Sequence, residues 1–273
     1  MSRSMHQITC GDSDLAATLD SAPGTTGLLI VSGGNEIRSG AHGGMAELAR
    51  KIAENGFPVL RFDRRGIGDS SGPNAGFAGS RDDIAAAADF LCQKCPRVQK
   101  LAGFGNCDAS TALALFQAEL GLDGLCIANP WTIEQTGQEP DAPSPPSAAA
   151  IRARYWQRLK NPGTYADLLR GRINLAKLFS GLKKAAKKEE ITPLALDLGE
   201  ALANLEIPCE LLIAEKDTTA RAFMACWESA RYARVTDKSN LALHSFDTAS
   251  HGFADKESKA WLEKRLLEFL SKL

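Results

Sequence analysis

One short stretch of the 273-residue chain decides the fold: Gly103-Phe-Gly105-Asn-Cys107-Asp-Ala109-Ser110. It follows a strand-like run at residues 98–103 and leads into a helical pattern at 109–120. The small residues two positions either side of Cys107 allow backbones to crowd at a sharp strand-to-helix turn. The pattern is that of a G-x-S-x-G elbow with Cys for Ser and Ala for the last Gly. It predicts a strand–turn–helix unit with Cys107 as a candidate nucleophile. The alternative is that Cys107 is a small buried apolar residue, as most free cysteines are.

The rest of the chain alternates short apolar runs with longer helical patterns, which favours βαβ units and a mostly parallel sheet flanked by helices. Strands are expected at residues 27–31, 58–62, 98–103, 124–128, 207–214 and 241–246. Helices are expected at residues 45–55, 81–95, 109–120 and 256–273. Residues 6–9 and 14–19 are expected to form an antiparallel hairpin at the edge of the sheet.

Residues 132–205 interrupt this alternation and are interpreted as a helical cap inserted into a core of residues 1–131 and 206–273. Within the segment, residues 151–188 carry eleven Lys and Arg but one Asp. Such a basic surface could attract an anionic substrate or membrane surface, or could be a solvated helix face. Arg170 and Arg172 lie beside apolar residues and are therefore candidate substrate contacts.

The overall composition excludes several classes of protein. A net charge of −1 argues against a globally basic nucleic-acid-binding protein. No run approaches the roughly 20 apolar residues of a membrane span, and residues 1–12 lack the apolar core of a secretory signal. Seven irregularly spaced cysteines indicate free thiols and a cytoplasmic location. Cys92-x-x-Cys95 has no second such pair and no nearby His, so neither a metal nor another cofactor is expected.

The partners of a nucleophile on such an elbow follow it in the order acid, then histidine. Asp217 ends the strand-like run 211–217, and His251 lies between the last strand and the last helix. We expect His251 to take the thiol proton and Asp217 to orient the imidazole. Glu215 and Asp247 are competing acids.

An oxyanion formed at Cys107 would need two N–H donors. One is expected from Asp108, the residue after the nucleophile, and the other from Gly33, Gly34 or Asn35 after the first buried strand. The alternative for this Gly-Gly-Asn segment is a plain tight turn. His42 heads the next helix and is expected to line the site rather than act as the base.

The chain resembles the α/β-hydrolase superfamily. Asp63-Arg-Arg65-Gly-Ile-Gly68-Asp-Ser70 looks like the D-x-R-G-x-G-x-S segment that supports the oxyanion loop there. Within the superfamily the chain is most similar to the exosortase A system-associated hydrolases of the first type. That similarity rests on Val31-Ser-Gly33-Gly34-Asn35, Arg38-Ser-Gly40-Ala-His42, Gly105-Asn-Cys107-Asp-Ala-Ser110, Asn129-Pro-Trp131, Tyr155-Trp156 and Gly171-Arg172-Ile-Asn174-Leu175. The resemblance implies an α/β-hydrolase fold, an esterase or thioesterase, and a genomic link to an exopolysaccharide and exosortase system.

Three functions stay open at this point. The first is hydrolysis of an ester or thioester through an acyl-enzyme on Cys107, acting on a small-molecule acyl substrate. The second is acyl transfer with the same residues. The third is a non-catalytic scaffold that binds a partner through the basic cap. An intact order of Cys107, Asp217 and His251 argues against a scaffold, which has no need of it. The oligomeric state is left open.

Overall fold

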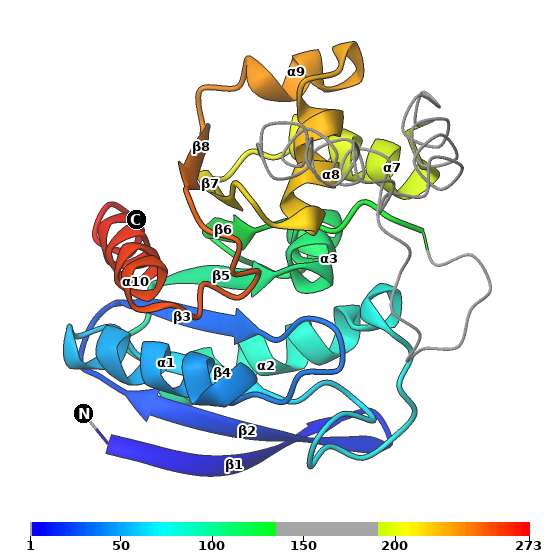
Figure 1. The fold of residues 1–273 in the computed structure, drawn as a ribbon. Helices are drawn as coiled ribbons and strands as arrows, with labels where there is room; N and C mark the ends of the chain where they lie inside the picture. Colours follow the sequence, from blue (N-terminus) through cyan, green and yellow to red (C-terminus); the bar gives the residue numbers. More distant parts are fainter. Residues whose placement is uncertain (1, 135–190) are drawn as a thin grey trace, which may run out of the picture.

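A computed structural model of the chain describes residues 2–134 and 191–273, and within them one eight-stranded sheet in the order β1-β2-β4-β3-β5-β6-β7-β8 (Figure 1). The first two strands are antiparallel and form the edge, and the remaining six run parallel to one another. The strands are β1 (Ser2–Cys10), β2 (Ser13–Ser21), β3 (Thr26–Val31), β4 (Val59–Phe62), β5 (Lys100–Asn106), β6 (Gly124–Ala128), β7 (Cys209–Ala214) and β8 (Leu241–Phe246). The mostly parallel sheet and its antiparallel edge hairpin are confirmed.

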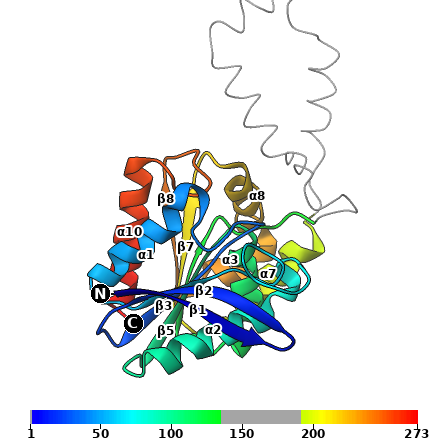
Figure 2. The same cartoon turned by 90° about the horizontal axis from the view of Figure 1, so that it is seen from below.

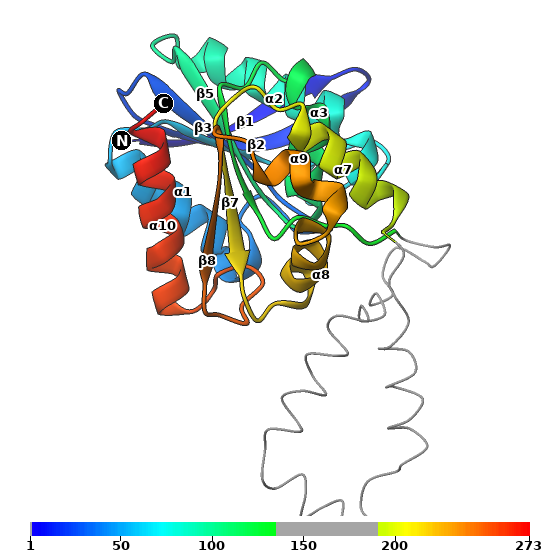
Figure 3. The same ribbon diagram turned by 90° about the horizontal axis from the view of Figure 1, so that it is seen from above.

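Helices cover both faces of the sheet (Figures 2 and 3). On one face lie α1 (Gly44–Glu54) and α10 (Lys256–Leu270). On the other face lie α2 (Arg81–Lys94), α3 (Asp108–Phe116), α7 (Pro193–Ala203), α8 (Thr218–Trp227) and the short α9 (Ala233–Thr236). Single 3-10 turns occur at Ala41–Gly43, Phe77–Gly79, Gln117–Glu119 and Ala230–Tyr232.

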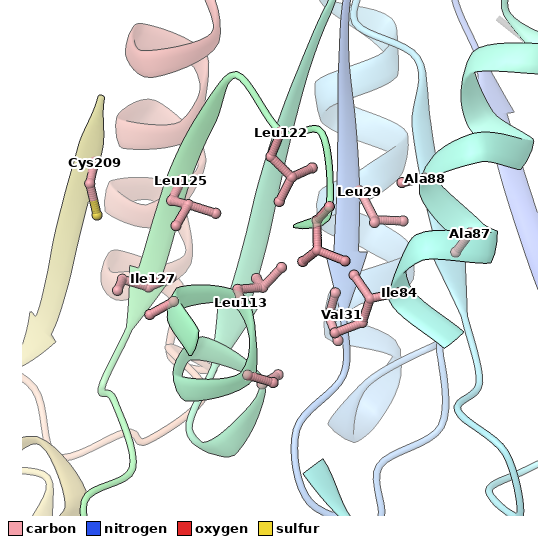
Figure 4. Packing of buried hydrophobic residues seen from close by; sticks show 14 of the residues in the cluster. Leu29, Val31, Ile84, Ala87, Ala88, Leu113, Leu122, Leu125, Ile127 and Cys209 are labelled. Carbon is pink, nitrogen blue, oxygen red and sulfur yellow. The ribbon is translucent and has the colours of Figure 1, made fainter. Parts of the chain in front are cut away.

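The apolar runs of the parallel strands contribute side chains to the cores on both faces of the sheet, because successive side chains of a strand point in opposite directions. In β3, Leu29 packs with the α2–α3 cluster, whereas Leu28 and Ile30 pack under α1 and α10. Figure 4 shows the first cluster, in which Leu113 of α3 and Ile84 of α2 lie over the side chains of β3 and β6. Solvent reaches almost none of the side chains of Leu28, Leu29, Ile30, Ile84 and Leu113. Burial on both faces explains why these strands read as continuous apolar runs.

The expected insertion is only partly described. Residues 135–190, with Arg170 and Arg172, lie outside the described residues, so the cap itself and these two arginines stay predictions. The helix α7 falls inside the expected range 132–205, yet Leu198 and Leu202 are fully buried in the α2–α3 cluster. Residues 193–203 thus pack as part of the core, because the apolar side of α7 covers α3 rather than a separate cap. The helices α8 and α9 were not predicted.

No helix within residues 2–134 and 191–273 has both the length and the apolar character that a membrane crossing requires.

Candidate active site

The turn at Cys107 has the strained geometry that its sequence predicts. Cys107 has φ 63° and ψ −127°, a region that non-glycine residues rarely adopt. Its N–H donates to the carbonyl of Ala128 at 3.0 Å, and its own carbonyl accepts from Ser110 at 3.1 Å. A Cβ at Gly105 would lie 2.9 Å from the backbone of Ala109, which explains the small residue there. The surrounding backbone therefore holds the thiol at the junction of β5 and α3.

The structure brings His251 and Asp217 to this thiol from distant parts of the chain. The imidazole Nδ1 of His251 lies 3.0 Å from Oδ2 of Asp217. Asp217 also caps α8 by accepting the N–H of Ala220 at 2.9 Å, so its carboxylate is held in place. Cys107 and His251 line the same cavity, and the Cys107 side chain lies close enough to the imidazole to influence its charge. The imidazole is therefore near both the sulfur and the carboxylate.

Two opposing effects set the charge of His251. Burial disfavours the imidazolium, but the hydrogen bond that it donates to the Asp217 carboxylate, the neighbouring Cys107 side chain and the negative charge of Asp217 favour it. Together they raise the pKa of His251 from its ordinary 6.5 to about 10. Burial likewise opposes the charged form of Asp217, yet the hydrogen bond and charge of His251 prevail and lower the pKa of that carboxyl. The site therefore favours an imidazolium beside a carboxylate at neutral pH.

The competing residues are engaged elsewhere. Glu215 accepts a hydrogen bond from the Ser245 hydroxyl at 2.6 Å, and Asp247 pairs with Lys216. The imidazole of His244 lies 2.7 Å from the guanidinium of Arg265. Each of these contacts lies at the β7–β8 end of the sheet and not on His251.

The loop after β3 packs closely against the nucleophile, with one departure from expectation. A Cβ at Gly33 would lie 2.4 Å from the carbonyl oxygen of Asn106 and 3.4 Å from Cβ of Cys107, so only glycine fits. The Gly34 N–H, an expected oxyanion donor, instead donates to the side-chain Oδ1 of Asp108 at 2.6 Å. The backbone N–H of Asp108 opens α3, and the first N–H groups of a helix have no intrahelical acceptor. Asn35 accepts a hydrogen bond from the Asn74 amide at 3.1 Å.

Arg64 and Asn129 support the site and were not singled out for it from the sequence. Arg64 is buried, donates to the Gly34 carbonyl, and lies 3.7 Å from the Asp108 carboxylate. Asn129 is fully buried with φ 43°, donates to the His251 carbonyl at 2.8 Å and accepts from the Ala214 N–H at 2.8 Å. It thus ties the histidine loop to β7. Arg64 lies in the segment 63–70 that the resemblance links to support of this loop, whereas the contacts of Asn129 join distant segments and have no local sequence signal.

A cavity of about 600 Å³ is lined by Cys107 and His251 and by residues of α1 and α10. Gly33, Gly34 and His42 line it. Its apolar wall consists of Val31, Met45, Leu48, Phe104, Phe253 and Leu262. Among the residues that the structure describes, no group of three or more His, Cys, Asp or Glu side chains could hold a metal ion. A small organic molecule fits this space, since ligand pockets span roughly 300–1,000 Å³.

Several solved structures share this architecture. An esterase of Pyrococcus furiosus superposes with a TM-score of 0.64 at 16% identity, over 99% of this chain and 91% of that one. A proline iminopeptidase of Mycobacterium smegmatis gives 0.62 at 18% identity, over 98% of each chain. GrgF, an α/β hydrolase of a Penicillium species, gives 0.62 at 17% identity, over 100% of this chain and 99% of that one. No curated protein matches the chain.

At these identities the solved structures establish the fold. The sequence itself goes further, because residues 28–263, from β3 to α10, match the profile of the alpha/beta hydrolase family. That match covers most of the chain and includes Cys107, Asp217 and His251. The chain belongs to the alpha/beta hydrolase family.

Proposed function

We propose that the protein hydrolyses an ester or thioester through an acyl-enzyme on Cys107, with His251 and Asp217 completing a catalytic triad. The observation that carries the proposal is that Cys107 and His251 line one ligand-sized cavity while Asp217 lies 3.0 Å from the far nitrogen of the imidazole. Esterases are among the structurally similar proteins.

The chemistry follows from the charges in the site. The thiolate attacks the substrate carbonyl carbon, a sulfur–carbon bond forms, and the carbonyl electrons move to oxygen. The oxyanion then collapses, the bond to the leaving oxygen or sulfur breaks, and the imidazolium of His251 protonates that leaving group. Water next gives a proton to His251 and attacks the thioester. This step releases the acid and restores the thiolate–imidazolium pair. Asp217 holds the imidazole throughout.

Stabilisation of the oxyanion requires a change at the loop after β3. The Asp108 N–H points along the start of α3, where the helix dipole also favours negative charge. The Gly34 N–H becomes a second donor once it leaves the Asp108 carboxylate. Substrate binding would drive that exchange, since a developing oxyanion is the stronger acceptor.

The remaining thiols differ from Cys107 in their surroundings. Burial raises the pKa of the buried thiols Cys10, Cys126 and Cys209. Partial desolvation also raises the pKa of Cys95, which is half-buried, and of Cys92, which is exposed. A buried thiol is a poor nucleophile because it stays protonated. Labelling with iodoacetamide at neutral pH should therefore modify Cys107 first. A Cys107 that reacts no faster than the other thiols would count against the proposal, and a Cys107→Ala variant with full activity on a thioester panel would end it.

Two alternative functions are compatible with the same residues. Acyl transfer needs only an acceptor alcohol in place of water, and the product formed with an added alcohol distinguishes it from hydrolysis. A scaffold that binds a partner through the basic residues 151–188 would keep its binding in the Cys107→Ala variant. The finer expectations stand as part of this proposal: an exosortase-associated subtype, a cytoplasmic location, and an anionic substrate group contacted by Arg170 and Arg172.

A further inference from the structure

We propose that the acyl group of the substrate is an apolar chain that lies between α1 and α10. This inference rests on the proposed function, because it takes Cys107 as the atom that carries the acyl group. It concerns the specificity of the site and not the reaction itself.

Among the described residues, apolar side chains from the sheet and from both helices form much of the cavity wall near Cys107. Phe104 of β5 lies on the sheet side, Met45 and Leu48 of α1 form one wall, and Leu262 of α10 forms the other. Phe253, buried with φ 51°, lies beside His251 in the loop that leads to α10. An acyl carbonyl at Cys107 would therefore direct its chain into an apolar space, which favours hydrocarbon over a polar group.

Two ion pairs join α1 and α10 beside this space. Glu47 of α1 lies 3.3 Å from Lys259 of α10, and Lys51 lies 2.7 Å from Glu263. Glu47 and Lys51 are four residues apart, as are Lys259 and Glu263, so each helix presents one acid and one base to the other. All four side chains also line the cavity.

The pairing argues against a charged chain end in the cavity. A carboxylate or phosphate on the acyl group would have to break one of these ion pairs to find a partner, and each lysine already has one. In this proposal the two ion pairs border the apolar space and limit the length of chain that fits.

The test is a series of p-nitrophenyl esters with acetyl, butyryl, octanoyl and dodecanoyl groups. For the wild type we expect kcat/KM to rise by about fourfold for each methylene that enters the cavity, from the free energy of burying one CH2. It should then fall once the chain exceeds the space. A kcat/KM that does not depend on chain length would overturn the inference.

Two substitutions move the limit in opposite directions. Met45 is only partly buried, so Met45→Trp should fold, and it fills the cavity. We expect it to lower the octanoyl-to-acetyl ratio of kcat/KM at least tenfold. Leu48→Ala enlarges the cavity and should move the optimum to a longer chain. Leu91→Ala, an equal truncation in α2 on the other face, is the control and should keep the wild-type ratio.

The outcomes separate this inference from the proposed function. If Met45→Trp and Leu48→Ala leave the chain-length profile of the wild type while Cys107→Ala abolishes hydrolysis, the acyl group lies elsewhere and the triad stands. If Cys107→Ala hydrolyses the same esters at the wild-type rate, the proposed function itself fails.

Discussion

The two faces of the sheet are built from the same strands but differ in how they are filled. On the face of α2, α3, α7 and α8, side chains such as Leu113, Ile127 and Phe223 are buried completely. On the face of α1 and α10, the core includes Leu28 and Ile30, but a cavity of about 600 Å³ remains near the carboxyl ends of the strands.

Cys107 lies at the boundary between these two faces. It ends β5 and precedes α3, whose Ala109, Ala112 and Leu113 are buried on the packed face. The thiol itself lines the cavity on the other face. The packed face holds α3 and the nucleophile in place, which allows the strained turn to persist. The face with α1 and α10 leaves room for a substrate.

The largest expected effect separates the two roles at Cys107 itself. Cys107→Ala should lower kcat/KM on a thioester by about a thousandfold or more, because the covalent path is lost. Its Tm should stay close to that of the wild type, since alanine keeps the small side chain of the turn. Steady-state kinetics and a thermal melt check both. A large fall in Tm would mean that the loss of activity reflects misfolding.

A truncation on the packed face should do the reverse. Leu91→Ala removes a fully buried side chain and should lower the free energy of unfolding by about 2–5 kcal/mol. The kcat/KM of the folded fraction should not change, because Leu91 lies in α2, away from the cavity. Urea denaturation and kinetics below the unfolding transition measure the two quantities. A selective loss of kcat would show that the two faces are not independent.

The charge on His251 can be followed by pH, which tests the site on the face of the sheet that carries the cavity. An NMR titration should place the pKa of His251 near 10, and lower in Cys107→Ala, which lacks the sulfur that helps to raise it. Because this folded-state pKa lies above the ordinary 6.5, the imidazolium contributes stability that is fully present below pH 6.5. That stability is lost as the pH rises through about 10. The Tm difference between wild type and His251→Asn should shrink over this range. Equal pKa values in both proteins would contradict the influence of Cys107.

A smaller effect is expected at Asp108. Asp108→Asn keeps an acceptor oxygen for the Gly34 N–H but removes the charge that strengthens the bond. The Gly34 N–H should then be released more easily to an oxyanion, and kcat should rise severalfold. Asp108→Glu, which keeps the charge, is the control. A fall in kcat for Asp108→Asn would mean that the carboxylate holds the loop in its active form.

The smallest effect is expected at the ion pairs between α1 and α10. Lys51 and Glu263 are about a third and a fifth exposed, so their attraction is partly screened by solvent. Lys51→Met should change the free energy of unfolding by less than about 1 kcal/mol. Chemical denaturation at low and high salt measures it. A loss of several kcal/mol would show that the ion pairs stabilise the fold rather than border the cavity.

The fold was predictable where one residue pattern determines one element. The buried parallel strands, the edge hairpin, and the helices at 44–54, 81–94 and 256–270 follow from apolar periodicity and from terminators such as Gly56 and Pro96. The helix α8 is harder to predict, because its N-cap Asp217 is also the candidate acid and one residue has two roles. Assignment of α7 to the core depends on contacts with α3, which no local pattern reveals.

The candidate site was predictable in outline, because the order of elements in a parallel sheet brings Cys107, Asp217 and His251 to the same edge. Its details depend on side-chain contacts between remote segments. The Gly34 N–H bonds to a carboxylate 74 residues away, and Asn129 reaches the His251 carbonyl across 122 residues. Both contacts depend on where the backbone turns, and not on residue type alone.

The most direct test of the central claim is the mass of the intact protein after brief incubation with an acyl thioester. The account predicts one added acyl group, mapped by peptide digestion to Cys107, which accumulates in His251→Ala under conditions that permit acylation but slow the attack of water. An acyl group on another cysteine, or none on Cys107 while the thioester is hydrolysed, would contradict it.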